Sequence, residues 1–318
     1  MLNVLGVDTS NYTTSVSLID IDKMTVYQSK LMLPVKSGEV GIRQSDAVFH
    51  HTKQLPIAIS NLLKKADITR FDIKTVGVSK SPRLAEGSYM PCFLVGESFA
   101  SAFSELCGID LYKTSHQIGH ILSALFSSNK LDLIKNKECF IAFHVSGGTT
   151  DCLLCEPCDN DVLSVTEIGT SLDLKAGQAI DRIGVKLGLD FPCGAELEKL
   201  ALLSSKSYNT NPAIKDNNCC LSGLQNICEK MLMGGEKPCD IAKFCIKYIS
   251  DTIIAMSQRA RKVYINAPIV FAGGVMSNKI IRDEISVKLS NVYFAEPEFS
   301  RDNAVGTALF AAIKKELI

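Results

Sequence analysis

Short apolar runs alternate with longer amphipathic segments through the first third of the chain. Residues 4–10 begin as a buried strand and end in small polar residues, and two further stretches alternate apolar and polar positions. Between residues 44 and 66, Val48, Leu55 and Ile59 recur at helical spacing. The expected elements are strands at residues 4–10, 13–19, 25–30 and 76–79 and helices at residues 44–66 and 96–106. This segment therefore predicts the order β-β-β-α-β-α, opening with an antiparallel meander.

A second cycle begins near Tyr112 and repeats the plan with more helices. The expected elements are strands at residues 140–146, 150–155, 269–272 and 292–294 and helices at residues 116–125, 176–187, 196–203, 222–233, 240–263, from about 278, and 302–317. The duplication predicts two related α/β domains facing each other across a cleft. We expect the first to span residues 1–112, joined by a C-terminal helix at 303–318. The second should span residues 113–302 and carry helical insertions.

Composition narrows the class of protein. The chain has 318 residues, 46% hydrophobic and 21% charged, with a formal net charge of zero. These values are typical of a folded protein and exclude long disorder. They give no sign of the basic surface that a protein binding nucleic acid alone usually needs. No apolar run approaches 18 residues and no leader pattern is visible, so we expect a cytoplasmic protein without membrane spans.

The twelve cysteines do not indicate a disulfide framework in a chain of this length. Cys152, Cys155 and Cys158 have a spacing that occurs in iron–sulfur proteins. Cys152 and Cys155 lie on a predicted strand and would point to opposite faces, and no fourth cysteine follows with the expected proline. We therefore predict ordinary apolar cysteines here.

Three turns are candidates for holding phosphate and nucleoside groups. Asp8, Thr9 and Ser10 end the first strand, where hydroxyls and backbone N–H groups could meet a phosphate–metal pair. Residues 146–151 (Ser-Gly-Gly-Thr-Thr-Asp) join two strands, and glycines there let the backbone approach an anion. Residues 273–278 (Gly-Gly-Val-Met-Ser-Asn) form a strand-to-helix turn with a polar end. Each turn is a weak signal by itself, and their combination favours a nucleotide site.

His116 and His120 form the sharpest pattern in the sequence. Positions i and i+4 of a helix stack on one face, so both imidazoles can reach one cation. Residue 117 is Gln117, not the glutamate that a zinc protease requires as its general base. The alternative is a pair of histidines on a partly buried helix face. Asp302, near the last helix, could be a metal ligand or a helix N-cap.

Short motifs spread over nearly the whole chain together resemble one family. They are Leu5-Gly-Val-Asp-Thr-Ser, Ser81-Pro-Arg-Leu, Leu94-Val-Gly-Glu-Ser-Phe-Ala, Ser115-His-Gln-Ile-Gly-His, Val145-Ser-Gly-Gly-Thr-Thr, Gly177-Gln-Ala-Ile-Asp-Arg, Phe191-Pro-Cys-Gly, Leu221-Ser-Gly-Leu, Gly273-Gly-Val-Met-Ser-Asn and Arg301-Asp-Asn-Ala. The chain resembles the TsaD-type threonylcarbamoyl transferases, formerly described as glycoproteases. The resemblance implies an actin/Hsp70-like (ASKHA) fold with two domains around a nucleotide.

The resemblance also implies roles for individual residues. His116, His120 and Asp302 would hold one divalent metal or iron ion (Fe, Zn or Mg), which acts as a Lewis acid during acyl transfer to tRNA. ATP or an acyl-adenylate would be bound by residues of the three turns and two further positions. These residues are Asp8, Thr9, Ser10, His144, Val145, Ser146, Gly147, Gly148, Asp181, Gly194, Gly274 and Asn278.

Three departures from the family pattern lie near the expected acyl-transfer chemistry. Tyr12 and Thr13 stand where the family has carboxylates, and Thr149 stands where it has a histidine. We therefore expect a metal- and adenine-nucleotide-binding carbamoyl or threonylcarbamoyl transferase with altered acceptor chemistry, with tRNA a possible but unsupported acceptor. The alternative is a non-catalytic interaction subunit, acting as a homodimer or with a partner protein. A peptidase is disfavoured, because no nucleophile–base set is visible.

Overall fold

The computed structural model describes residues 2–10, 12–34, 42–300 and 304–318. Residues 1, 11, 35–41 and 301–303 lie outside this part of the chain. The metal-ligand prediction for Asp302 therefore falls outside the described residues. The chain divides into two compact units. Unit 1 comprises residues 1–126, 158–163 and 301–318, and unit 2 comprises residues 127–157 and 164–300.

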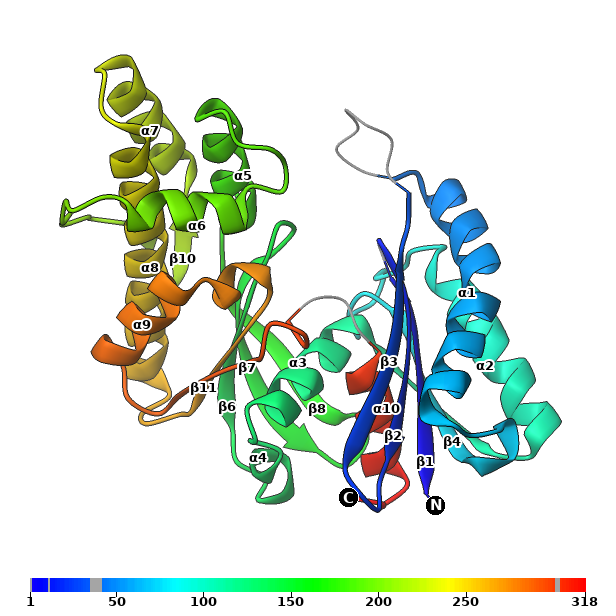
Figure 1. Cartoon of the computed structure of the whole chain (residues 1–318). Helices are drawn as coiled ribbons and strands as arrows, with labels where there is room; N and C mark the ends of the chain where they lie inside the picture. Colours follow the sequence, from blue (N-terminus) through cyan, green and yellow to red (C-terminus); the bar gives the residue numbers. More distant parts are fainter. Residues whose placement is uncertain (1, 11, 35–41, 301–303) are drawn as a thin grey trace. The chain divides into compact units, whose positions relative to one another are not determined.

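Unit 1 is a five-stranded mixed sheet with helices on both faces (Figure 1). The strands are β1 (Asn3–Ser10), β2 (Thr13–Asp20), β3 (Thr25–Met32), β4 (Ile73–Ser81) and β5 (Asp110–Ser115), in the order β3-β2-β1-β4-β5. The helices are α1 (Gln44–Ala66), α2 (Phe93–Cys107), α3 (His116–Ser127) and α10 (Val305–Lys314), with a short 3-10 helix η1 at Arg70–Asp72. β1, β2 and β3 form the predicted antiparallel meander, while β4 and β5 run parallel to β1.

The two faces of the β1 strand pack differently because successive side chains alternate. Leu5 and Val7 point into an apolar core that includes Leu55 and Leu62 of α1. Gly6 points to the other face, where the backbone of Ala304 and α10 lies so close that no side chain would fit. Unit 1 thus fixes the start of the last helix against the sheet.

Unit 2 is a second five-stranded mixed sheet covered by helices (Figure 1). Its strands are β6 (Phe140–Val145), β7 (Thr150–Cys158), β8 (Val162–Thr170), β11 (Ile269–Ala272) and β12 (Val292–Phe294), in the order β12-β11-β6-β7-β8. The helices are α4 (Asp132–Lys135), α5 (Ala176–Lys186), α6 (Gly194–Leu202), α7 (Ser222–Met233), α8 (Pro238–Val263) and α9 (Lys279–Lys288). A hairpin of β9 (Ala213–Lys215) and β10 (Asn218–Cys220) and a 3-10 helix η2 (Gly274–Ser277) complete it. Ile141 and Phe143 of β6 pack against Ile249 of α8 in one continuous core.

The predicted order of elements is largely confirmed, and the differences are local. α1, α7, β11 and β12 have the predicted bounds. β5, β8 and the β9–β10 hairpin were not predicted, because their buried and exposed residues do not alternate regularly or the strands have only three residues. The last helix begins at Val305, later than the predicted residue 302. Residues 113–126, which were predicted to begin the second domain, lie in unit 1, since β5 completes its sheet.

Two further predictions concern the cysteines and membrane spans. Cys152 and Cys155 are buried free thiols, and burial raises the pKa of the Cys152 thiol to about 12. Such thiols are inert structural groups, because the thiolate is the reactive form. None of the helices in the described residues is both long and apolar enough to cross a membrane.

Candidate metal and nucleotide sites

The predicted metal histidines lie at the start of α3 in unit 1, beside the end of β1. Asp8 Oδ2 is 2.7 Å from His116 Nδ1, and both residues are buried. The carboxylate accepts, so Nδ1 carries the proton and the lone pair of the ring is on Nε2. The second oxygen, Oδ1, accepts the backbone N–H of Ser10 at 2.8 Å. A carboxylate that orients a histidine in this way is typical of the groups that surround metal ligands.

His120 presents its ring to the same point as His116. The two Nε2 atoms are 2.9 Å apart, and the rings meet edge to face at 79°. Two nitrogens that each lie about 2.1 Å from one ion, at close to a right angle, would be about 3 Å apart. The predicted helical spacing therefore does bring both imidazoles to a common position, and the pair fits a cation bound through nitrogen.

Two observations test whether further oxygen ligands fit beside this pair. The hydroxyl of Ser10 is fully buried on the same face of β1 as Asp8 and has no hydrogen-bond partner among the described residues. The backbone N–H of Ala304 donates to Ser15 Oγ at 2.9 Å, and Ser15 is the cross-strand partner of Asp8. The chain is thus anchored near Asp8 two residues after Asp302. Within residues 2–10, 12–34, 42–300 and 304–318, no three metal-binding side chains are grouped together.

The predicted glycine turn of unit 2 joins β6 to β7 and is held by its own hydroxyls. Ser146 Oγ lies 2.8 Å from Thr149 Oγ1 and accepts the backbone N–H groups of Gly148 and Thr149. α5 begins directly against this turn, and a side chain at Gly177 would collide with the backbone of Gly147. Gly177, which was not predicted as a site residue, therefore allows α5 to pack directly against the turn. Its only signal in the sequence is its place in a family motif.

Four of the predicted site glycines have no structural explanation. A Cβ on Gly147, Gly148, Gly194 or Gly274 would meet nothing within 4 Å, and none of the four has a positive φ. Neighbouring Gly273 differs, since its φ is +99° and its Cβ would collide with the backbone of Val145. This close approach brings η2 next to the end of β6. Open space above glycines is a cradle that a ligand backbone or phosphate can approach.

The other predicted nucleotide residues have identifiable structural partners. Asn278 caps α9, because its Oδ1 accepts the backbone N–H of Ile281 at 3.1 Å. Thr9 Oγ1 donates to the carbonyl of Cys92 and accepts the N–H of Gly96, so it anchors α2. Val145 is a fully buried core residue.

Asp181 lies on α5 and is tied to the start of α6. Its Oδ1 accepts the backbone N–H of Cys193 at 2.8 Å, one residue before Gly194. Burial raises the pKa of this carboxyl above its ordinary value, although the hydrogen bond acts in the opposite direction. α5 and α6 are therefore held together where the predicted residues Asp181 and Gly194 lie.

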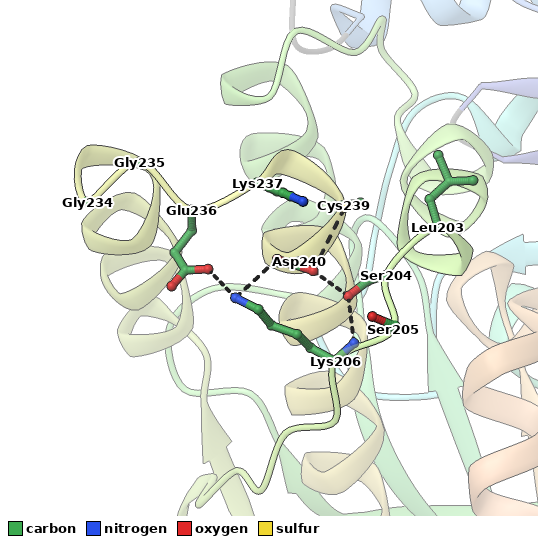
Figure 2. Close-up of a pocket in the computed structure, with 10 residues that line it drawn as sticks. All are labelled: Leu203, Ser204, Ser205, Lys206, Gly234, Gly235, Glu236, Lys237, Cys239 and Asp240. Carbon is green, nitrogen blue, oxygen red and sulfur yellow. Dashed lines mark hydrogen bonds and ion pairs between the residues drawn. The ribbon is translucent and has the colours of Figure 1, made fainter.

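A pocket of about 400 Å³ in unit 2 contains none of the predicted residues (Figure 2). It lies at the start of α8, where Lys206 Nζ reaches Glu236 Oε2 at 2.6 Å and Asp240 Oδ2 at 3.1 Å. Ser204 also donates to Asp240, and this bond lowers the pKa of the Asp240 carboxyl. Because these charges satisfy one another, they hold the loop after α6 against the loop after α7 and the first turn of α8.

The fold of the two sheets defines the class of the protein. Two five-stranded mixed sheets, each opening with an antiparallel pair of strands, are the architecture of the actin/Hsp70-like fold. Component A of the (R)-2-hydroxyglutaryl-CoA dehydratase of Acidaminococcus fermentans superposes with a TM-score of 0.60 over 100% of this chain and 99% of that one, at 16% identity. A ROK family glucokinase from Streptomyces griseus, complexed with glucose and AMPPNP, gives a TM-score of 0.55 over 98% and 99% of the chains, at 12% identity. These similarities establish the fold.

Sequence comparison establishes the family. The family model described as TsaD, tRNA N6-adenosine threonylcarbamoyltransferase, matches residues 29–309. A tRNA N6-adenosine threonylcarbamoyltransferase of Thermosipho melanesiensis is 31% identical over 318 residues, covering 96% of this chain and 93% of that protein. A probable bifunctional tRNA threonylcarbamoyladenosine biosynthesis protein of Thermoplasma acidophilum is 28% identical over 98% of this chain and 56% of its own length. The chain belongs to the TsaD family.

Proposed function

We propose that the protein transfers a carbamoyl-type acyl group, of the threonylcarbamoyl kind, from an acyl-adenylate to an amine acceptor. The observation that carries this proposal is the pair of Nε2 atoms 2.9 Å apart in a member of this family, with Asp8 orienting His116. A scaffold subunit would have no use for two buried imidazoles aimed at one point. A catalytic protein is therefore favoured over the alternative of a non-catalytic interaction subunit.

In this proposal His116, His120 and Asp302 hold one iron, zinc or magnesium ion. Such an ion would act as a Lewis acid on the phosphate and carbonyl oxygens of the substrate. Asp8 keeps His116 in the tautomer whose Nε2 can bind the ion, and the buried Ser10 hydroxyl can accept or donate a hydrogen bond beside it. The chain's own groups thus prepare the position before any ligand arrives.

The adenine nucleotide is proposed to bind in unit 2, over the open glycines. Gly147 and Gly148 would admit the phosphates, and Gly194 and Gly274 would lie against the nucleoside. Support comes from the absence of any packing or φ requirement for glycine at these four positions. His144 and Asp181 are proposed to contact the substrate, and Asn278 acts through the α9 cap.

The acceptor chemistry is proposed to differ from that of other family members. Tyr12 is partly exposed at the β1–β2 hairpin, and Thr13 is the next residue. A phenol and a hydroxyl stand there, and neither supplies a carboxylate. Thr149 Oγ1 is hydrogen-bonded within its own turn and brings no imidazole. Each lost charged or hydrogen-bonding group near a transition state costs about two to three orders of magnitude in rate. We therefore expect slow transfer of the acyl group to tRNA. We also expect the protein to be cytoplasmic and to act as a homodimer or with a partner subunit.

The experiment that tests the proposed function is release of AMP from threonylcarbamoyl-adenylate under single-turnover conditions. Wild-type protein loaded with iron or zinc should release AMP faster than the uncatalysed reaction and should label unmodified tRNA slowly. The double variant His116→Ala/His120→Ala serves as the matched control. Equal rates of AMP release by the two proteins would contradict the proposed transferase and favour the alternative of a non-catalytic interaction subunit.

A further inference from the structure

One loop of unit 1, the β4–α2 loop at residues 82–92, is fastened at both ends beside the histidine pair. At its start, the carbonyl of Pro82 accepts the backbone N–H of Gln117 at 3.0 Å, and Gln117 lies on α3 between the two histidines. At its end, the carbonyl of Cys92 accepts the hydroxyl of Thr9 at 2.9 Å. Thr9 directly follows the aspartate that orients the first histidine. The loop therefore begins and ends at the neighbours of the candidate metal site.

Internal hydrogen bonds and a small apolar cluster fix the conformation of this loop. The backbone N–H of Ser88 donates to the carbonyl of Ala85, and the backbone N–H of Arg83 donates to Ser88 Oγ, each at 3.0 Å. Met90 packs against a buried cluster made of Leu33, Ala47, Cys92 and Phe93. The shape of the loop is thus set by contacts of the chain itself, before any ligand binds.

Tyr89 stays in the open while its neighbour Met90 is packed inside. The side chain of Tyr89 is 61% exposed, and Leu84 on the same loop is 41% exposed. Tyr89 is three residues before Cys92, and three residues of extended chain span at most about 11 Å. A large aromatic ring is therefore held in the open at the rim of the candidate metal site.

We propose that Tyr89 stacks on the base that carries the acceptor amine and so directs this amine to His116 and His120; this inference rests on the proposed function. Proteins commonly hold single bases by stacking them on exposed aromatic rings, because every base has a flat π-face. A tyrosine side chain has only two rotatable bonds, so little conformational entropy is lost on contact. The acceptor is then an amine on a nucleobase, since a small aliphatic amine offers no flat face.

The place of the loop decides which substrate the ring can meet. In the proposed function the acyl group is activated at His116 and His120, so the acceptor must come to these residues. Both ends of the β4–α2 loop lie beside them, and a base resting on Tyr89 is therefore on the same side of unit 1. Stacking supplies binding, and it does not replace the charged groups that are missing at residues 12, 13 and 149. The protein should therefore bind bases more readily than it acylates them.

The stacking contact is tested by fluorescence, which requires no turnover. The chain contains no tryptophan, so Tyr89→Trp in the full-length protein introduces a single reporter at the proposed contact. Single-stranded oligoadenylate should lower the fluorescence of this variant saturably, and an abasic oligonucleotide of the same length should not. Phe49→Trp places the reporter on another exposed position of unit 1, where neither ligand should have an effect. No loss in Tyr89→Trp, or an equal loss with the abasic ligand or in Phe49→Trp, would overturn the stacking.

The role in transfer is tested by initial rates at varied concentrations of unmodified tRNA. Tyr89→Ala should raise KM for tRNA about 5- to 150-fold and leave kcat nearly unchanged, because a contact that is equal in ground and transition states affects KM alone. Tyr89→Phe keeps the ring and should keep the wild-type KM. A fall in kcat at unchanged KM, or a Tyr89→Phe protein as defective as Tyr89→Ala, would overturn the role. If the wild type transfers no acyl group to tRNA, the proposed function fails, and the fluorescence result still decides whether Tyr89 binds a base.

Discussion

Gly306 of α10 lies directly against Gly119 of α3. A Cβ on Gly306 would fall under 3.0 Å from the carbonyl oxygen of Gly119, closer than real Cβ atoms come to other atoms. Gly119 is between His116 and His120 on the same helix, and Gly306 is four residues after Asp302. The crossing of two glycines therefore fixes how near the last helix can begin to the histidine pair.

The first prediction is that Gly306→Ala separates α3 from α10. Overpacking of this kind costs about 1–3 kcal/mol in the free energy of unfolding, and the ion content of the purified protein should fall with it. Urea unfolding and metal analysis measure the two effects. Gly223→Ala is the matched control, because a Cβ there meets nothing within 4 Å. A Gly306→Ala protein as stable as this control would contradict the close crossing.

The second prediction concerns the open glycines of unit 2. Gly148→Ala should leave the melting temperature of the free protein nearly unchanged, since its Cβ would enter open space. The same substitution should reduce the rise in melting temperature that millimolar ATP produces by mass action. Gly223→Ala again provides the control. Equal ATP shifts in Gly148→Ala and wild type would remove Gly148 from the site.

Asn278→Ala is a poorer test of nucleotide binding than the glycine variants. Its Oδ1 caps α9, so the substitution should destabilise the protein by about 1 kcal/mol before any ligand is added. The glycine substitutions separate binding from stability, and the cap substitution does not.

The third prediction follows from the buried ring of His51 on α1. Thr14 Oγ1 donates to Gln54, so His51 Nδ1–H donates to Thr14 at 2.8 Å. The buried Nε2 has no partner within the part of the chain that the structure describes. Burial lowers the pKa of His51 to about 4, while the charge of Asp8 raises it and that of His50 lowers it. Between pH 6.5 and 4 the unfolded chain therefore binds a proton that the folded chain does not.

Folding stability should fall as the pH decreases through this window, by on the order of 3 kcal/mol from this residue once the pH is below 4. His51→Asn keeps a donor toward Thr14 and lacks the titrating ring. Urea unfolding from pH 7 to pH 4.5 should show a smaller loss in the variant than in the wild type. Parallel losses would show that His51 does not contribute to acid sensitivity.

The fourth prediction is that the protein does not replace a tRNA threonylcarbamoyl transferase in a strain that lacks one. Tyr12, Thr13 and Thr149 together remove groups that each contribute about two to three orders of magnitude. Nucleoside analysis of the tRNA from the complemented strain is the measurement. Normal levels of threonylcarbamoyladenosine would mean that the substitutions do not alter the acceptor chemistry.

The sequence predicted the elements that bury a regular apolar face. α7 and β11 have the predicted bounds, because their apolar positions recur with a clear period. β8 was missed because its pattern of buried and exposed residues is irregular. Helix spacing also predicted that His116 and His120 meet, since i and i+4 share a face whatever the fold.

Contacts between distant segments could not be predicted. The hydrogen bond between His116 and Asp8 joins residues 108 positions apart, and no local sequence pattern indicates it. The same holds for the close contact of Gly119 with Gly306. The position of His144 opposite Asp151 depends on the register of the β6–β7 hairpin, which the length of its turn sets. The candidate residues could be predicted from the sequence, but their spatial neighbours depend on strand register and helix packing.

The central claim is that a metal ion and an adenine nucleotide bind to this protein through the residues named above. Native mass spectrometry with metal analysis tests this claim most directly. Wild-type protein expressed in medium containing iron and zinc should carry about one ion per chain and should add one adenine nucleotide. His116→Ala/His120→Ala should lose the ion and keep the mass and fold of the chain. An ion retained in full by the double variant, or a wild-type protein that binds neither ion nor nucleotide, would contradict the account.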